Sequence, residues 1–200
     1  INIITHLYYT ILYYTLCSQI NIQRYKDNPI WLVYQTLTMC GIFTLLNNNN
    51  HIPQSIIQSC FENGKGRGPE FSSLSHCAIK AQLGFHRLAI NGLNDGANQP
   101  IRIRNISLIC NGEIYNYKEL YKTINVSPTT DSDCEVIIHT YLKYGIEQTL
   151  RMLDGVFAFV LVETRFNAPS KIYVARDPYG VRPLYQMKPI SRSKSYKNHL

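Results

Sequence analysis

The cysteines of this chain lack the spacing of a metal centre or a disulfide framework. Six cysteines are scattered over 200 residues, without a Cys-x-x-Cys pair or a histidine spacing of the zinc-binding type. Structural zinc sites and disulfide scaffolds both depend on such spacings. The sequence therefore predicts reduced thiols, a cytoplasmic protein and no metal site.

Charged residues and long apolar runs are scarce near the start of the chain. The first residue is not methionine, and the first charged residue is Arg24. Threonine and histidine interrupt residues 3–16, which fall short of the ~20 apolar residues that a membrane-spanning helix needs. The basic start of a signal peptide is also lacking. We expect no membrane segment, and we interpret residues 1–38 as a leader outside the folded domain.

This leader has two interpretations. It is either a propeptide that is cleaved before Cys40 or upstream sequence translated ahead of a true start at Met39, and we favour the second. At the other end, residues 186–200 form a basic tail with four basic residues and no acidic one. Residues 39–185 carry 14 Lys and Arg against 12 Asp and Glu. Because the net charge of +7 lies mostly in a tail that is typical of solvated segments, no nucleic-acid partner is expected.

Residues 39–185 have the length of one domain with its own core, and the chain as a whole is 45% hydrophobic. Apolar runs typical of strands alternate with a few short amphipathic helices, which indicates an α+β layered fold rather than a doubly wound one. The predicted strands are residues 40–46, 83–90, 106–110, 156–163 and 171–175. The predicted helices include residues 53–61 and 134–144.

Several residues predict where the helices begin and end and which side chains cap them. Ser132 and Glu135 match a capping box at the start of the 134–144 helix. Gly145 is expected to end that helix. Asn116, together with Glu119, is expected to cap a further short helix that runs through Leu120.

Cys40 is the first candidate for chemistry. If Met39 is the start and is removed, Cys40 carries both a thiol and a free α-amine. The amine, with a pKa of about 7.7 to 8.0, can serve as base for a thiol with a pKa of about 8.5. The alternative is that this cysteine simply enters a buried strand, and the local sequence alone favours that alternative.

Polar residues at the ends of two predicted strands complement such a nucleophile. The Asn111 side chain and the Gly112 N–H can point two donors at one oxyanion, although Asn-Gly is also a strong hairpin signal. Glu113 can pair with an ammonium group. Arg87 suits a carboxylate, or else an ordinary salt bridge. Asp133 is explained equally well by the positive end of a helix.

Seven blocks, in this order, resemble the glutaminase domain of class II glutamine amidotransferases, which are N-terminal-nucleophile hydrolases. They are most similar to the asparagine synthetase branch, while residues 176–184 also resemble the amidophosphoribosyltransferase branch. The blocks are Met39-Cys40-Gly41-Ile42-Phe43, Arg67-Gly68-Pro69, His86-Arg87-Leu88-Ala89-Ile90, Asn111-Gly112-Glu113-Ile114-Tyr115-Asn116, Ser132-Asp133-Cys134-Glu135-Val136, Leu153-Asp154-Gly155-Val156-Phe157-Ala158-Phe159 and Arg176-Asp177-Pro178-Tyr179-Gly180.

The resemblance implies a four-layer αββα sandwich of two antiparallel sheets, with an incomplete C-terminal edge, that hydrolyses glutamine to glutamate and ammonia. It implies that Cys40 is the nucleophile, and that Asn111 and Gly112 form the oxyanion hole. The implied glutamine-binding residues are Arg87 for the α-carboxylate, Glu113 and Asp133 for the α-amine, and the backbone of Leu88, Ile90 and Asn91. A non-catalytic remnant that binds glutamine is the alternative.

The resemblance also has departures and implied partners. Glu70 and Gly66 stand where the family usually has aspartate and histidine around Arg67-Gly68-Pro69. The half that would use the ammonia does not follow residue 185. The resemblance implies a synthetase domain or subunit as partner, with ATP and Mg²⁺ bound there, and it implies no cofactor in this chain.

Overall fold

The computed structural model describes residues 10–13, 39–46, 52–78, 81–89 and 95–186. The chain forms eight strands, three α-helices and three 3₁₀ turns within these residues. The strands are β1 (Thr10–Tyr13), β2 (Gly41–Leu46), β3 (Phe71–Ala78), β4 (Ala81–Arg87), β5 (Ile101–Ile103), β6 (Ile106–Ile114), β7 (Gly155–Glu163) and β8 (Lys171–Arg176). The helices are α1 (Gln54–Glu62), α2 (Tyr117–Ile124) and α3 (Val136–Met152), and the 3₁₀ turns are η1 (Lys65–Arg67), η2 (Asp95–Ala97) and η3 (Asp133–Glu135).

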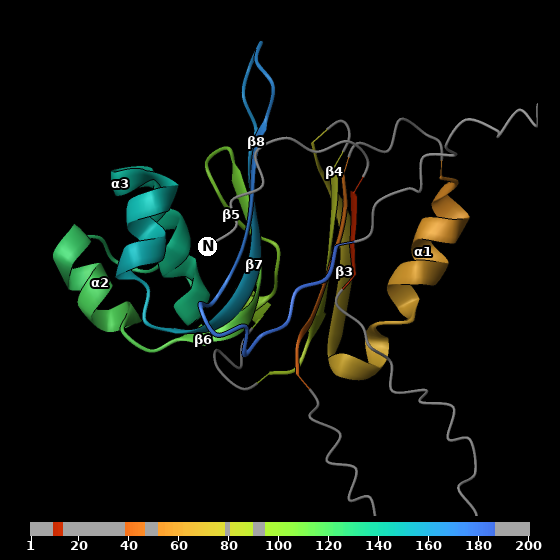
Figure 1. Cartoon of the computed structure of the whole chain (residues 1–200), viewed down its shortest axis with the longest axis horizontal. Coiled ribbons are helices and arrows are strands. Elements are labelled where there is room, and N and C mark those ends of the chain that lie inside the picture. The colour runs from red at the N-terminus through yellow and green to blue at the C-terminus, as the bar shows by residue number, and fades with distance from the viewer. Residues whose placement is uncertain (1–9, 14–38, 47–51, 79–80, 90–94, 187–200) are drawn as a thin grey trace, which may run out of the picture.

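Two antiparallel sheets face each other between two layers of helix. The strand orders are β1-β2-β4-β3 and β5-β6-β7-β8. Helix α1 covers the outer face of the first sheet, and α2 and α3 cover the outer face of the second (Figure 1). The predicted α+β fold with an αββα arrangement is therefore confirmed. No helix of the described part of the chain is long and apolar enough to cross a membrane.

Three apolar clusters fill the spaces between these layers. Strand β7 shows how the sequence divides its side chains, because successive residues point to opposite faces of a sheet. Phe157, Phe159 and Leu161 pack toward α2 and α3, whereas Val160 and Val162 pack between the two sheets. A strand that is buried on both faces reads as a continuous apolar run, which is why the strand was predictable from its sequence.

The first sheet divides its side chains in the same way. Ile42 of β2 and Phe85 of β4 pack between the sheets, whereas Phe43 packs against Phe61 of α1, with their ring centroids 5.9 Å apart. Strand β1 pairs with β2 along its whole length, although it lies in the segment that the sequence assigned to a leader. Strands β3 and β5 were not predicted, because β3 is rich in serine and β5 has only three residues.

The Asn111-Gly112 pair lies inside a strand and not in a hairpin turn. Strand β6 continues to Ile114 and pairs with β7 throughout, up to the Ile114–Gly155 pair. Gly112 permits this close pairing, since a Cβ atom there would lie 2.3 Å from the Val156 carbonyl oxygen. The hairpin interpretation of Asn-Gly is therefore wrong, and both residues are held on a regular strand.

The predicted helix caps were wrong in their details. Neither Ser132 nor Asn116 makes a side-chain cap. The buried Glu135 carboxylate instead accepts N–H bonds from Thr129 and Thr130, at 2.8 and 2.6 Å, because the preceding loop folds back over it. Asn116 donates from its side chain to the Met152 carbonyl, at 2.8 Å.

The predicted end of the 134–144 helix at Gly145 is confirmed. Gly145 adopts a non-helical conformation, with φ 75° and ψ 173°, at a kink inside α3. The chain resumes a helix after this residue, since Ile146 and Leu150 bury their side chains against the second sheet. Gly145 therefore separates two helical segments, as expected, without a loop between them.

Candidate active site

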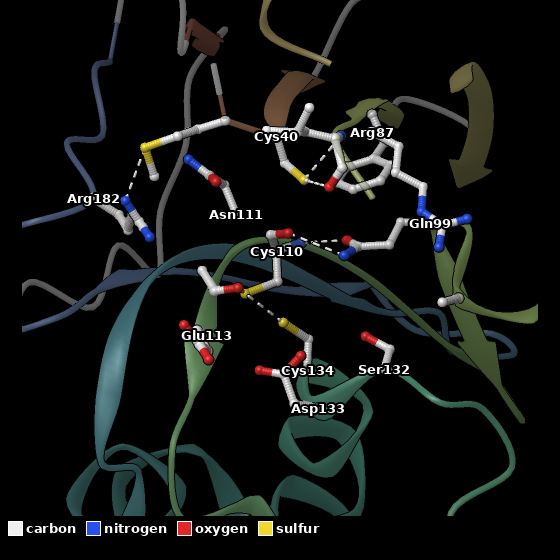
Figure 2. A pocket seen from close by; sticks show the side chains of 15 residues that line it. Cys40, Arg87, Gln99, Cys110, Asn111, Glu113, Ser132, Asp133, Cys134 and Arg182 are labelled. Carbon is white, nitrogen blue, oxygen red and sulfur yellow. Dashed lines mark hydrogen bonds between the residues drawn. The ribbon is translucent and has the colours of Figure 1, made fainter. Parts of the chain in front are cut away.

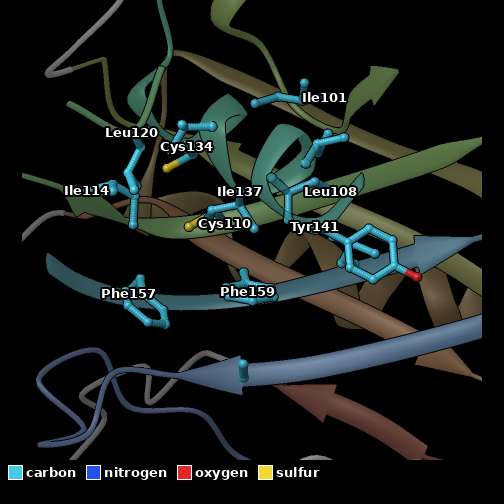
Figure 3. Close-up of a cluster of buried hydrophobic side chains, with 14 of the residues drawn as sticks. Ile101, Leu108, Cys110, Ile114, Leu120, Cys134, Ile137, Tyr141, Phe157 and Phe159 are labelled. Carbon is cyan, nitrogen blue, oxygen red and sulfur yellow. The ribbon is translucent and has the colours of Figure 1, made fainter. Parts of the chain in front are cut away.

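Three candidate residues lie between the sheets because side chains alternate between the two faces of a strand. Cys40 lies two residues before Ile42, Arg87 two after Phe85, and Asn111 two after Ile109. Residues two apart on a strand share a face, and those three hydrophobic residues all pack between the sheets. The candidate side chains therefore point into the end of the same inter-sheet space (Figure 2).

A pocket occupies this end of the sandwich. The residues around it come from both sheets, from η3 and from the segment after β8. They are Met39, Cys40, Phe85, Arg87, Leu88, Ala97, Gln99, Cys110, Asn111, Gly112, Glu113, Ser132, Asp133, Cys134 and Arg182. The pocket thus contains all of the predicted catalytic and glutamine-binding residues that the structure describes. The predicted residues Ile90 and Asn91 lie outside the described residues.

The Cys40 thiol is held by the backbone of Leu88. The thiol donates to the Leu88 carbonyl oxygen and accepts the Leu88 N–H, each at 3.4 Å. Burial raises the pKa of this thiol, against the opposing effects of the Leu88 backbone and the Arg87 charge. A thiol in this state is protonated at neutral pH, so its use as a nucleophile requires a base.

Asn111 presents an unused donor to the pocket. Its side chain is 2% exposed, and its amide nitrogen has no hydrogen-bond partner in the structure. A buried donor without a partner costs about 1 to 3 kcal/mol. Such a cost is commonly found where a ligand or a transition state supplies the missing acceptor.

Arg87 is fixed from two directions. Its Nη1 atom donates to the Asn98 side-chain oxygen, at 2.7 Å. The loop before β3 packs on its backbone: a Cβ atom on Gly68 would lie 2.4 Å from the Arg87 carbonyl carbon, and the Glu70 carboxylate accepts the N–H of Ala89. The departure at Glu70 is therefore accommodated, because the longer acid still reaches the backbone next to the site.

Acidic groups line the opposite side of the pocket from Arg87. Glu113 is exposed and Asp133 is buried, and both lie across the pocket from Arg87 (Figure 2). The Asp133 carboxylate accepts the N–H of Ile114 at 2.6 Å. Burial raises the pKa of Asp133, an effect that its backbone hydrogen bonds oppose. A pocket with a cation on one side and two acids on the other matches the two charges of an α-amino acid.

Because the pKa of Asp133 is raised, replacing it by asparagine should stabilise the fold at neutral pH, although it should also weaken the binding of glutamine. A carboxyl whose pKa is raised in the folded state stabilises the fold when protonated, and this contribution is lost as the pH rises from 3.8 through the folded pKa. Asp133→Asn removes the cost of burying a charged carboxylate, and the asparagine side chain can still accept the Ile114 N–H. We expect its melting temperature to exceed that of the wild type at pH 7, and the two to converge as the pH falls toward 3.8.

The same substitution should weaken glutamine binding. Loss of a charged partner for the substrate ammonium should raise the KM for glutamine by about 10- to 100-fold. Melting curves between pH 3.5 and 8, together with steady-state kinetics, measure the two effects. Equal or lower stability of Asp133→Asn at pH 7 would show that burial does not disfavour this carboxylate.

His86 is a structural residue. Its Nε2–H donates to the Phe61 carbonyl at 2.8 Å, and its Nδ1 lies 2.7 Å from the Ser72 hydroxyl. Burial lowers the pKa of this imidazole. The ring stacks on Phe61 with centroids 4.1 Å apart, so that His86 joins β4 to α1 on the side away from the pocket.

The sequence did not point to several residues of the pocket. Gln99 follows no motif that distinguishes it from an ordinary loop residue. Ser132 belongs to a capping-box pattern and to one of the seven blocks, but neither predicted a place for it in the pocket. Arg182 reaches the site because the Asp177 carboxylate accepts the N–H groups of Val181 and Arg182, at 2.9 and 3.0 Å, and thereby turns the chain. No group of three His, Cys, Asp or Glu residues suited to a metal ion occurs within the described ranges.

A family model and several curated proteins match this chain. The model of the glutamine amidotransferase domain family matches residues 39–196. The chain belongs to this family. The asparagine synthetase (glutamine-hydrolysing) of Gallus gallus is 40% identical over 160 residues, and that of Homo sapiens is 39% identical over 155 residues. Each alignment covers 74% of this chain and 26% of the relative.

The chain therefore spans about a quarter of the length of these curated relatives. Among solved structures, the glutamine phosphoribosylpyrophosphate amidotransferase of B. subtilis aligns with a TM-score of 0.42 and 26% identity. That alignment covers 54% of this chain and 27% of the other. The family match covers residues 39–196, and the residues that line the pocket lie inside this range.

Proposed function

We propose that this domain hydrolyses the side-chain amide of glutamine, with Cys40 as the nucleophile. The observation that carries the proposal is the arrangement around one pocket of a thiol, an unpartnered amide donor, an arginine and two acids. Arg87 binds the α-carboxylate of glutamine, while Glu113 and Asp133 bind its ammonium group. These contacts direct the side-chain amide toward Cys40 and Asn111.

The reaction proceeds through a thioester. The α-amine of a mature Cys40 takes the thiol proton, and the sulfur attacks the amide carbon. The Asn111 side chain and the Gly112 N–H stabilise the resulting oxyanion. The C–N bond then breaks, and the leaving nitrogen takes the proton from the amine to depart as ammonia. Water, deprotonated by the same amine, cleaves the thioester to glutamate and restores the thiol.

The free amine of Cys40 provides the test of this function. In a chain that continues upstream of Cys40, this nitrogen is an amide and has lost its basicity. We expect protein that begins at Cys40 to release ammonia and glutamate from glutamine, and the 200-residue chain to release neither. Both products are measured enzymatically, with asparagine as a control substrate. No ammonia from the Cys40-initiated protein would exclude the proposed function.

We further propose that the ammonia serves an asparagine synthetase reaction in the cytoplasm. Support comes from the 39–40% identity to asparagine synthetases and from the free state of all five described cysteines. ATP and Mg²⁺ would then bind only in a synthetase domain or subunit. If that domain is added with aspartate, ATP and Mg²⁺, glutamine should support asparagine formation. Hydrolysis without asparagine would point to another acceptor.

A further inference from the structure

Next to the oxyanion hole, the Gln99 side chain makes the hydrogen bonds to β6 that a neighbouring strand would otherwise make. Its side-chain nitrogen donates to the Cys110 carbonyl at 3.0 Å, and its side-chain oxygen accepts the Cys110 N–H at 2.5 Å. Both bonds end on the residue immediately before Asn111. Gln99 is only 6% exposed. Its amide is thus committed to the backbone of β6, and Figure 2 shows the pair of bonds.

The strand register explains why a side chain does this. Strand β5 pairs with β6 from Ile103–Ile106 to Ile101–Leu108. Continuing this register by two residues would place Gln99 opposite Cys110. Strand β5, however, begins at Ile101 and does not extend back through Pro100. The Gln99 amide supplies the donor and acceptor that a strand residue opposite Cys110 would otherwise present.

The neighbouring residue holds the other half of the site. The Asn98 side-chain oxygen accepts the bond from Arg87 described above, and the Asn98 backbone N–H donates to the Asp95 carbonyl at 3.0 Å. The Gln99 carbonyl accepts the Ser73 hydroxyl at 2.6 Å, which ties the segment to β3. Gln99 therefore holds the strand that carries the oxyanion donors. The adjacent Asn98 holds the arginine that faces the acids.

We propose that Gln99 is the positioning residue for the oxyanion hole, and that Asn98 is the positioning residue for the arginine that binds the substrate carboxylate. This inference rests on the glutaminase function proposed above. Oxyanion donors act in the transition state, so a change at Gln99 lowers kcat. The carboxylate contact is made in the ground state as well, so a change at Asn98 raises KM.

The kinetic test uses protein that begins at Cys40. Gln99→Met retains the length of the side chain but removes both bonds, and Gln99→Glu sets a carboxylate oxygen against the Cys110 carbonyl. A displacement of about 1 Å is enough for a loss of about 10²-fold. We expect both variants to lose about 10- to 100-fold in kcat with KM changed less than about threefold. Asn98→Ala should raise KM about tenfold and change kcat less than about threefold.

Gln82→Met is the matched control. Gln82 lies at the end of β4 that is far from the site, and it has the same 6% exposure as Gln99. Its side-chain amide donates to the Gln54 side chain on α1. This variant loses a buried hydrogen bond without contact with the site, so it should retain both kinetic constants. The proposal would be overturned if the Asn98 and Gln99 variants changed kcat and KM in the same way. It would also be overturned if Gln82→Met lost as much kcat as Gln99→Met.

Hydrogen exchange tests the Gln99 bonds without turnover. In the 200-residue chain, Gln99→Met should accelerate exchange of the Cys110 amide at least about tenfold, while amides of β7 remain protected. Unchanged exchange at Cys110 would refute the positioning role. If wild-type protein beginning at Cys40 hydrolyses no glutamine, the proposed function fails, and exchange alone then decides whether Gln99 holds Cys110.

Discussion

Cys40→Ser in protein that begins at this residue should lower the rate of glutamine hydrolysis at least about 10³-fold. The variant retains the α-amine and nearly the same side-chain volume, so only the nucleophile changes. A hydroxyl is a far weaker acid and a poorer nucleophile than a thiol, so an amine and a site matched to a thiol activate it much less well. The structure adds that the thiol is already protonated at rest, because burial raises its pKa. Ammonia release under saturating glutamine measures the loss.

A second cysteine controls for general effects of the thiol-to-hydroxyl change. Cys60 is a half-buried free cysteine on α1, outside the pocket. Cys60→Ser should retain wild-type kcat and KM. If Cys40→Ser retained more than about a tenth of the wild-type rate, while Cys60→Ser behaved as wild type, Cys40 would not be the nucleophile.

Asn111→Ala should lower kcat by about 10² to 10³-fold, which corresponds to about 2.7 to 4 kcal/mol of transition-state stabilisation. The KM for glutamine should change little, because the amide oxygen carries its full charge only in the tetrahedral intermediate. The melting temperature should not fall, because the Asn111 side-chain nitrogen has no partner to lose in the folded protein. This combination of a large kinetic loss with unchanged stability distinguishes an oxyanion donor from a structural asparagine.

Asn105 provides the comparison on the same hairpin. Its side chain donates to the Thr164 carbonyl at 2.6 Å, away from the pocket. Asn105→Ala should therefore lower the melting temperature without altering kcat. Steady-state kinetics and thermal unfolding of both variants make the comparison. A melting temperature lowered in Asn111→Ala, with kcat near the wild-type value, would assign Asn111 a structural role instead.

Most of the strands were predictable because burial on both faces leaves a strong local signal. Strand β7 is apolar on both faces, since one face packs on helices and the other on the opposite sheet. Strand β3 escaped prediction because its serines lie on a partly exposed edge. The capping box failed because Glu135 had the N–H groups of Thr129 and Thr130 within reach, and no local pattern reveals which donor a folded loop presents.

The sequence by itself determined the chemical groups of the site and the faces on which they lie. Cys40, Arg87 and Asn111 each stand two residues from a side chain that packs between the sheets, so the period of a strand directs them into one space. Their roles also follow from residue chemistry: a thiol beside its own amine, a guanidinium for a carboxylate, an amide for an oxyanion.

Only the tertiary structure decided how these groups are held. The bonds of Gln99 to Cys110 and of Asn98 to Arg87 join segments that are 11 residues apart. They exist because β5 pairs with β6 in one register and begins only after Pro100. The Leu88 contacts with the Cys40 thiol span 48 residues. Such contacts depend on the relative placement of strands, which the identity of the residues alone does not specify.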